Sequence, residues 1–246
     1  GYAAHNNAFD ARNKALDTLY AQVYATLNAR ERQLLWIMCL AFPNQVSLSI
    51  FEDFFDWTQS VLEQIVSRLQ ALFWIECSSS ADNTLTIAQS LNNYLRRRLI
   101  SDTTMIVRQE QFLASLKADS SQAISSSDIQ LVEWLLQSDW TDMTQQDKQA
   151  LTNLYYQAAL EMDRHRTWYN LWMSDPQLLN EDDAAMCLAF VRCARRVGDH
   201  QAASEMLSNV ILQTGANGNF DLQAQGRLEL AISARLRGKY RQAQST

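Results

Sequence analysis

The chain has 246 residues, of which 47% are hydrophobic and 20% are charged, and its formal net charge at pH 7 is −6. This composition is that of an ordinary globular protein, long enough for one large domain or two smaller ones with buried cores. The negative charge argues against a general affinity for nucleic acid or anionic membranes, because both require clustered positive charge. With only two prolines and six glycines, the sequence favours long helices over strands and turns.

The cysteines and the hydropathy predict a reduced, cytoplasmic protein. No two cysteines form a C-x2-C pair, and three of the four lie inside apolar helical patterns, as small core residues do. We expect free thiols at Cys39, Cys77, Cys187 and Cys193. No stretch of ~20 apolar residues could span a membrane, and no signal peptide is visible. The chain begins at Gly1 without a methionine and stops at Thr246 inside a helical pattern, so we expect it to belong to a longer protein.

The first hundred residues predict a compact helical domain with a β-hairpin. The expected helices cover residues 8–27, 30–42, 47–55, 58–72 and 90–100, and the strands cover residues 73–77 and 84–87 around a polar turn at 78–83. Asn28 and Glu31 have the spacing of a capping box, and Thr58 is expected to cap the fourth helix. Three helices followed by one hairpin are typical of the winged-helix variant of the helix-turn-helix. Residues 1–100 are therefore expected to form a winged-helix domain with a preceding helix.

Residues 101–246 predict helices without strands. The helical patterns cover about 102–118, 128–138, 145–162, 165–173, 182–196, 200–213, 220–236 and 239 onward. Paired antiparallel helices with short polar links favour a helical solenoid. The fold class expected for the whole chain is therefore mainly α.

An internal repeat supports the solenoid. Residues 188–203 align with residues 228–243, which places Gly198 and Gly238 at equivalent positions 40 residues apart. A glycine at this point lets the chain leave one helix with positive φ and begin the next at once. The pattern resembles the tetratricopeptide repeat, so residues 101–246 are expected to form tetratricopeptide-like repeats, truncated at the C-terminus.

The repeats are degenerate. The tetratricopeptide period is about 34 residues, so the 40-residue spacing predicts an inserted loop at residues 214–218. An earlier copy around residues 154–168 has Asp163 where the later copies have glycine, and Trp168 where they have a small residue.

The first hundred residues also resemble the winged-helix module of STAND signalling ATPases of the NB-ARC and NACHT type. The matching stretches are residues 19–28, the apolar helix at 33–43 and residues 92–95. The resemblance implies an upstream nucleotide-binding domain in the same chain, whose state the winged helix relays. The family often has a histidine against the nucleotide phosphate where this chain has Ala88, which cannot donate a side-chain hydrogen bond. A winged helix followed by helical repeats is a common order in bacterial members.

The sequence predicts no catalytic, cofactor or metal site. No G-x-x-x-x-G-K-[ST] loop occurs, so no cradle for a triphosphate is expected. The three histidines (His5, His165 and His200) are far apart and lack Cys or acidic partners at ligand spacing. Residues 181–183 are acidic but open a helix, where carboxylates cap free N–H groups. We therefore expect a protein that is not an enzyme.

DNA binding remains an alternative for the winged helix. The fourth helix would enter the groove, yet Arg68 is its only base, while Gln59, Gln64 and Gln70 could contact base edges. The one basic run, residues 96–98, ends a helix, where cations are favoured without any ligand. The seven tryptophans lie mostly at stripe positions and are expected in the core.

The repeats carry the sharpest hypothesis, a partner-binding groove. In tetratricopeptide arrays the first helix of each pair lines the inner groove, and this sequence would place polar and basic residues there. They are Asn153, Gln157, Arg192, Arg195, Arg196 and Arg235. Such a groove would suit a protein or an acidic peptide. The alternative is a solvated helix face with partners inside the chain.

Together these features predict a non-catalytic relay and peptide-binding module of a larger STAND-type signal-transduction ATPase. One alternative is a transcription regulator whose winged helix binds DNA and whose helical repeats regulate it. Another is a plain repeat scaffold without a switch.

Overall fold

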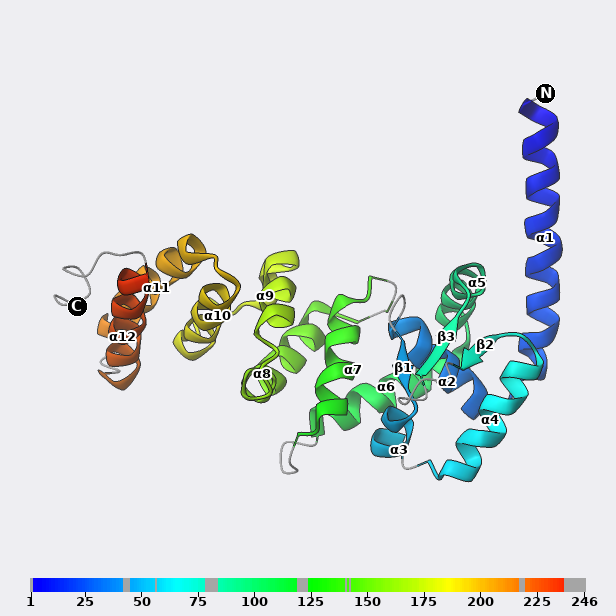
Figure 1. Ribbon diagram of the computed structural model, residues 1–246, viewed down its shortest axis with the longest axis horizontal. Coiled ribbons are helices and arrows are strands. Elements are labelled where there is room, and N and C mark those ends of the chain that lie inside the picture. The colour runs from blue at the N-terminus through cyan, green and yellow to red at the C-terminus, as the bar shows by residue number, and fades with distance from the viewer. Residues whose placement is uncertain are drawn as a thin grey trace. The chain divides into compact units, whose positions relative to one another are not determined.

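The structure is a computed structural model, and it describes residues 2–41, 45–55, 57–77, 84–118, 124–139, 141, 143–216 and 220–236. The chain divides into two compact units, residues 1–114 with 138–141 and residues 115–137 with 142–246. Over the described ranges it is mainly helical, as predicted, with twelve α-helices, one 3-10 helix and three short strands (Figure 1).

The first unit combines helices with a small sheet. Its elements are α1 (Tyr2–Thr26), α2 (Ala29–Ala41), β1 (Val46–Ser47), α3 (Ser49–Phe55), α4 (Gln59–Ala71), β2 (Ile75–Cys77), β3 (Thr84–Ile87), α5 (Gln89–Ile100) and the beginning of α6 (Thr103–Ala118). The core helix is α2, in which every residue from 34 to 41 is buried, as its nearly all-round apolar pattern predicts.

Reciprocal hydrogen bonds begin α2 and confirm the predicted capping box. The Asn28 backbone N–H donates to Glu31 Oε2 at 2.7 Å, and the Glu31 N–H donates to Asn28 Oδ1 at 3.0 Å. Thr58 does occupy the N-cap position of α4, but its side chain makes no capping hydrogen bond. Thr58 therefore lies at the predicted position, but the predicted hydrogen bond from its side chain to the start of the helix is absent.

The sheet contains one strand more than the predicted hairpin. Its three strands are antiparallel in the order β1-β3-β2, and Val46 pairs with Leu85 while Ile75 pairs with Ile87. The helix expected from residue 47 begins only at Ser49, because buried Val46 belongs to a strand that pairs with β3. The turn expected at residues 78–83 lies outside the described residues.

Phe73 shortens the first predicted strand, which was expected over residues 73–77. It has φ of 58°, and its N–H donates to the Gln70 carbonyl at 2.9 Å while the Trp74 N–H donates to the Leu69 carbonyl at 3.0 Å. These bonds close α4 in a left-handed turn, so β2 begins at Ile75 rather than at Phe73.

The second unit is built of antiparallel helices. After the end of α6 come α7 (Ser126–Gln137), α8 (Gln145–Glu161), α9 (His165–Ser174), the 3-10 helix η1 (Pro176–Leu178), α10 (Ala184–Val197), α11 (His200–Ala216) and α12 (Phe220–Leu236). Helix α10 packs against α8, α9, α11 and α12 (Figure 1). The predicted inserted loop is wrong for residues 214–216, which extend α11; residues 217 and 218 lie outside the described residues.

Two helix turns in this unit have the same backbone geometry 35 residues apart. Asp163 has φ of 60° between α8 and α9, and Gly198 has φ of 91° between α10 and α11. In each turn the following N–H closes the helix, Arg164 onto the Ala159 carbonyl at 3.0 Å and Asp199 onto the Ala194 carbonyl at 2.8 Å. Asp163 thus does in the earlier copy what glycine does in the later one.

The tryptophans of the described residues are core residues, as predicted. Each is at most 8% exposed, and the six are Trp36, Trp57, Trp74, Trp134, Trp168 and Trp172. Trp140 lies outside the described residues. In the second unit Trp168, Trp172 and Phe190 form one aromatic cluster, with ring centroids 5.7 Å and 6.0 Å apart.

Candidate functional site

The candidate site is a hollow of about 470 Å³ in the second unit. Its walls come from α8, α10 and α12, with His165 from the start of α9. On α10 the lining residues 185, 188, 189, 192 and 196 follow helical spacing, so one face of α10 forms the floor. Helices α8, α10 and α12 therefore face the same space.

One part of the hollow is apolar and leaves room for a side chain. Ala185 and Ala189 are one turn apart on α10, and their small side chains keep the floor open. Leu160 of α8, Leu188 of α10 and Leu222 of α12 line the same space. An apolar ligand side chain would be shielded from water there.

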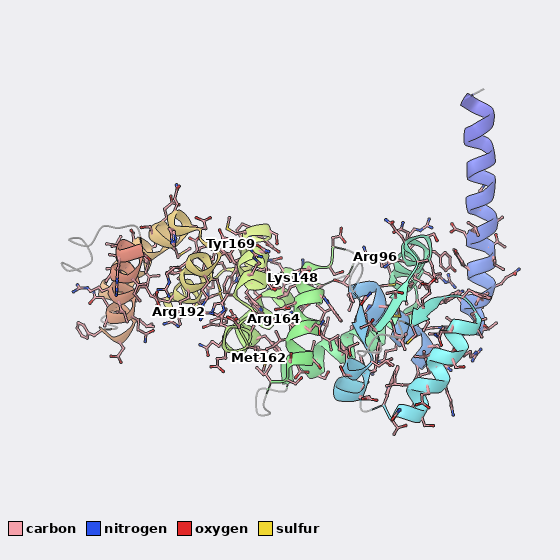
Figure 2. The ribbon with its side chains drawn as sticks, in the orientation of Figure 1. Arg96, Lys148, Met162, Arg164, Tyr169 and Arg192 are labelled. Atoms are coloured by element: carbon pink, nitrogen blue, oxygen red, sulfur yellow. The ribbon has the colours of Figure 1, made fainter. Side chains whose placement is uncertain are left out.

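Arg192 lines the hollow and donates hydrogen bonds to two residues of α12. Its Nε donates to Glu229 Oε1 at 3.1 Å and its Nη2 donates to Gln225 Oε1 at 3.3 Å, both on α12. The Arg192 side chain is still 44% exposed. It thus keeps donor capacity on the open side, where a carboxylate could bind. Figure 2 labels Arg192 on α10.

The other predicted arginines are placed differently. Arg196 lines the same hollow and forms an ion pair with Asp163. Arg195 is 20% exposed and pairs with Glu229 at 3.2 Å, outside the lining. Arg235 is an exposed residue of α12 that does not line the hollow. Three of the four predicted arginines therefore have acidic partners inside the chain, as the alternative reading of this face expected.

His165 lines the hollow as a neutral side chain. Burial lowers its pKa below the ordinary value and Arg196 lowers it further, against the opposing effect of Asp163, which lies 3.1 Å from Nδ1. Because the ordinary pKa of histidine is about 6.5, the imidazole is uncharged at pH 7. The positive charge at the hollow therefore comes from Arg192 and Arg196, and Glu161 of α8, which also lines the hollow, opposes it.

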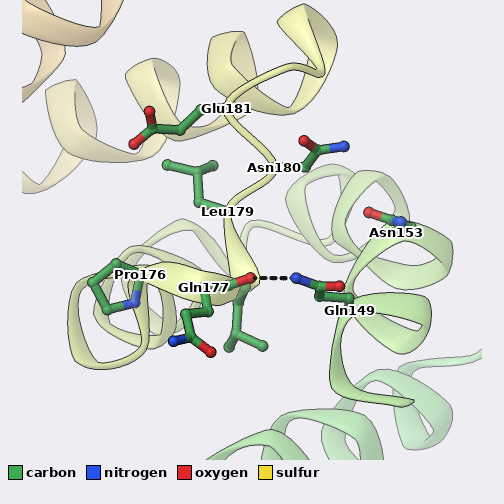
Figure 3. Close-up of a pocket in the computed structure, with 8 residues that line it drawn as sticks. Gln149, Asn153, Pro176, Gln177, Leu179, Asn180 and Glu181 are labelled. Atoms are coloured by element: carbon green, nitrogen blue, oxygen red, sulfur yellow. Dashed lines mark hydrogen bonds between the residues drawn. The ribbon is translucent and has the colours of Figure 1, made fainter. Parts of the chain in front are cut away.

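The two amide residues predicted on α8, Asn153 and Gln157, line two different hollows. Gln157 lines the hollow with Arg192, whereas Asn153, one turn earlier, lines a second hollow of about 530 Å³. Figure 3 shows this second space, where Gln149 Nε2 donates to the Gln177 carbonyl at 3.0 Å. Amide side chains both donate and accept, so this part of α8 can hydrogen-bond a peptide backbone.

Acidic and amide partners of the arginines were missed by sequence reasoning. Glu229 and Gln225 come from α12, and Asp163 from the left-handed turn. The available signal was the row of polar and small residues on α12, at positions 225, 226, 229 and 233, which share one helical face. A polar face on a helix within an array predicts polar contacts with its neighbour.

The bases singled out for DNA binding, Arg68 and residues 96–98, all contact other groups of the first unit. Arg68, the only base of α4, pairs with buried Glu31 at 2.9 Å and donates to the Thr26 carbonyl at 3.0 Å. The basic run is also engaged within the first unit. Arg96 donates to the Cys39 carbonyl at 3.1 Å, Arg97 pairs with Asp17 at 3.3 Å, and the Arg98 guanidinium lies 5.6 Å from the Tyr24 ring centroid.

Three of the four cysteines and the acidic stretch at the start of α10 have structural roles. Burial raises the pKa of Cys39 and Cys193 to about 12 and that of Cys187 to about 11, so these thiols stay protonated at pH 7. Asp183 caps α10 by accepting from the Ala185 N–H at 2.9 Å, as expected for the acidic stretch. No group of three or more potential metal ligands occurs among the described residues.

None of the described helices is both long enough and apolar enough to cross a membrane. Comparison with known proteins gives no assignment, because no protein-family model, no curated protein and no solved structure matches the chain. Any function assigned to it must therefore rest on its own residues and their geometry.

Proposed function

We propose that the chain is a non-catalytic coupling module whose helical hairpins bind an acidic, partly apolar peptide or protein segment. The observation that carries this proposal is the hollow between α8, α10 and α12, with its alanine-lined floor and the part-exposed Arg192 at its rim. A ligand side chain such as Leu or Phe would enter beside Ala185 and Ala189. A neighbouring ligand carboxylate would then accept from Arg192.

The tetratricopeptide-like character of the second unit is part of the proposal. Its support is the 35-residue recurrence of the left-handed turn at Asp163 and Gly198, close to the ~34 residues of that repeat. Ala159 and Ala194, four residues before these turns, are both fully buried, as close packing of a helix pair requires. The amide-lined face of α8 would extend the peptide track beyond the hollow.

The relay role of the first unit follows from the proposed winged-helix identity. The strand order β1-β3-β2, with β1 between two helices and a hairpin after α4, is the order expected for that fold. The resemblance to STAND ATPases then implies an upstream nucleotide-binding domain as its partner. The native reading frame tests this: an encoded phosphate-binding loop upstream would support the relay, and its absence would remove it.

The DNA-binding alternative has weaker support. Arg68 is tied to Glu31, so α4 offers only uncharged donors, chiefly glutamines, for base contacts. Salt-dependent affinity for duplex DNA would favour this alternative, because phosphate contacts release counterions. The plain scaffold hypothesis would be favoured if neither DNA nor peptides bind.

Peptide capture tests the proposed function directly. The probe is a fluorescent pool of pentapeptides in which Leu or Phe is flanked by Asp or Glu, and a second pool carries Asn or Gln instead. We expect the chain to bind the acidic pool, and the double substitution Arg192→Gln with Arg196→Gln to weaken that binding about tenfold or more. Ala185→Leu, which fills the apolar floor, should weaken both pools.

The matched control is Arg235→Gln, which removes an exposed arginine of α12 that does not line the hollow. It should leave the affinity for the acidic pool within about twofold, since an exposed distant charge is screened. Far-UV circular dichroism would verify that each variant remains folded. Equal binding by the wild type and the arginine double variant would refute the groove.

A further inference from the structure

The partner of Arg192 has an unusual setting for a carboxylate. Glu229 is only 8% exposed, and both of its oxygens face arginines of α10. Oε1 accepts from Arg192, but Oε2 lies 3.2 Å from Arg195 without satisfying hydrogen-bond geometry, and it has no other partner among the described residues. A buried carboxylate with one oxygen so poorly bonded is held at an energetic cost.

The helix that carries Glu229 turns polar groups inward. On α12 the buried positions include Glu229 and Ser233, and the Ser233 hydroxyl has no hydrogen-bond partner among the described residues. The equivalent positions of α10, 40 residues earlier, are Ala189 and Cys193, both apolar and buried. At the two positions where α10 has apolar side chains, α12 therefore has a carboxylate and a hydroxyl.

The same helix leaves apolar groups outside. Leu228 is 61% exposed and Phe220 is 77% exposed, whereas Leu188, the equivalent of Leu228 on α10, is 1% exposed. A helix with a polar inner face and apolar exposed positions gains less from the hydrophobic effect than a conventionally amphipathic helix does. Glu229 supplies two ion pairs to the contact between α12 and α10.

These observations lead from the proposed groove to its regulation. We infer that Glu229 is an internal competitor for the carboxylate of an acidic ligand, and that ligand binding at Arg192 loosens the contact of α12 with α10. The inference rests on the proposed peptide-binding function. It makes Glu229 the residue that sets the affinity of the groove, and α12 the element that responds to occupancy.

Electrostatics gives the direction of the effect. Glu229 lies against the guanidinium of Arg192, which lines the hollow, so its negative charge opposes an incoming carboxylate at short range. A ligand carboxylate that attracts Arg192 also draws the guanidinium away from Glu229. Each event weakens the other, so occupancy and α12 docking are reciprocally coupled.

The test replaces Glu229 by its uncharged near-isostere. Glu229→Gln should bind the acidic pentapeptide pool roughly three- to tenfold more tightly than the wild type, with unchanged affinity for the Asn/Gln pool. The matched control is Asp163→Asn, which neutralises the acid paired with Arg196 but whose side chain is 78% exposed. Because solvent screens that charge, it should change the affinity by less than about twofold.

A second measurement follows α12 itself. Saturating the wild-type chain with the acidic pool should accelerate amide hydrogen exchange in α12 several-fold relative to α10. This readout needs no substitution, so it decides the question even where Glu229→Gln unfolds. Unchanged exchange in α12 with the peptide bound would overturn the loosening.

The outcomes separate the two proposals. Equal affinity of the wild type and Glu229→Gln for the acidic pool would overturn the competitor role and leave the groove standing. Weaker binding by Glu229→Gln would overturn it too, since Glu229 would then position Arg192 for the ligand. Binding of neither pool by either protein would overturn the groove and the competitor role together.

Discussion

The two helical hairpins of the second unit, α8–α9 and α10–α11, reach the same geometry with different residues. Asp163 and Gly198 both adopt positive φ at the turn, and Trp168 and Ala203 are both fully buried five residues later. The backbone repeat is therefore more regular than the sequence repeat. What a repeat must preserve is the turn geometry and the burial of that position, whatever the residue type.

A contact with the neighbouring helix α7 explains why the first hairpin has a large residue, Trp168, at this position. Trp168 Nε1 donates to Glu133 Oε1 at 3.1 Å, and Glu133 of α7 also accepts from Arg164. The first hairpin thus packs its tryptophan against α7.

The largest effect is expected from breaking that tryptophan contact. Trp168→Ala should lower the free energy of unfolding by about 3–5 kcal/mol, because it opens a cavity and removes a donor from buried Glu133. Urea unfolding followed by circular dichroism would measure the loss. Trp168→Phe, which keeps an aromatic ring but not the donor, should lose less. A loss below about 1 kcal/mol for Trp168→Ala would contradict this account.

At the equivalent position of the second hairpin, residue 203, a larger side chain rather than a smaller one is expected to destabilise the protein. Ala203→Leu should cost about 1–3 kcal/mol by overpacking, because residue 203 is fully buried. Ala202→Leu, at the adjacent and less buried position, is the control. Hydrogen exchange in α10 and α11 would report the loss locally. Tolerance of leucine at residue 203 would mean that the two hairpins differ less in packing than their residues do.

Periodicity was enough to predict much of the fold. The long helices have apolar stripes with a 3.6-residue period, and Asn28 with Glu31 carries a capping box that the structure contains. Strand β1 was missed because its two residues are too few to show an alternating pattern. Its existence depends on pairing with β3, which is a tertiary effect.

Left-handed residues other than glycine were the second source of error. Phe73 and Asp163 both close helices with positive φ, a role that sequence patterns assign to glycine. Phe73 is 92% exposed, so the bulky side chain gains no packing from its strained backbone, and nothing in the first unit explains the choice. Asp163 is more readily accepted there, because Asp tolerates this region better than bulky residues do.

Three of the six residues predicted for the groove line one hollow, and the charge balance around them was not predicted. Repeat alignment places Gln157, Arg192 and Arg196 on helix faces that do meet in one hollow. Their acidic partners come from the turn at Asp163 and from α12, and no local pattern links these segments to α10. Pairing across helices depends on three-dimensional packing, which one sequence does not contain.

A substitution in the turn at Gly198 is expected to lower the free energy of unfolding by less than the two core substitutions do. Gly198→Ala should destabilise the second hairpin by about 1 kcal/mol, because a Cβ is disfavoured at φ of 91°. No atom lies within 4 Å of the added Cβ, so backbone strain alone causes the loss. Urea unfolding would measure it, and Gly198→Asn, which tolerates positive φ, should lose less. Equal losses for alanine and asparagine would point to a cause other than the backbone.

The aspartate turn should respond to glycine with the smallest change and the opposite sign. Asp163→Gly removes the strain of positive φ, worth about 1 kcal/mol, but also the contacts of its carboxylate with His165 and Arg196. That side chain is 78% exposed, so its ion pairs contribute little, and glycine also adds freedom to the unfolded chain. The net expectation is a gain of roughly 0.5 kcal/mol in the free energy of unfolding. Asp163→Asn separates the terms, because it removes the charge and keeps the tolerance for positive φ. If Asp163→Gly loses stability while Asp163→Asn does so equally, the carboxylate outweighs the backbone, and the first hairpin depends on an ion pair where the second depends on glycine.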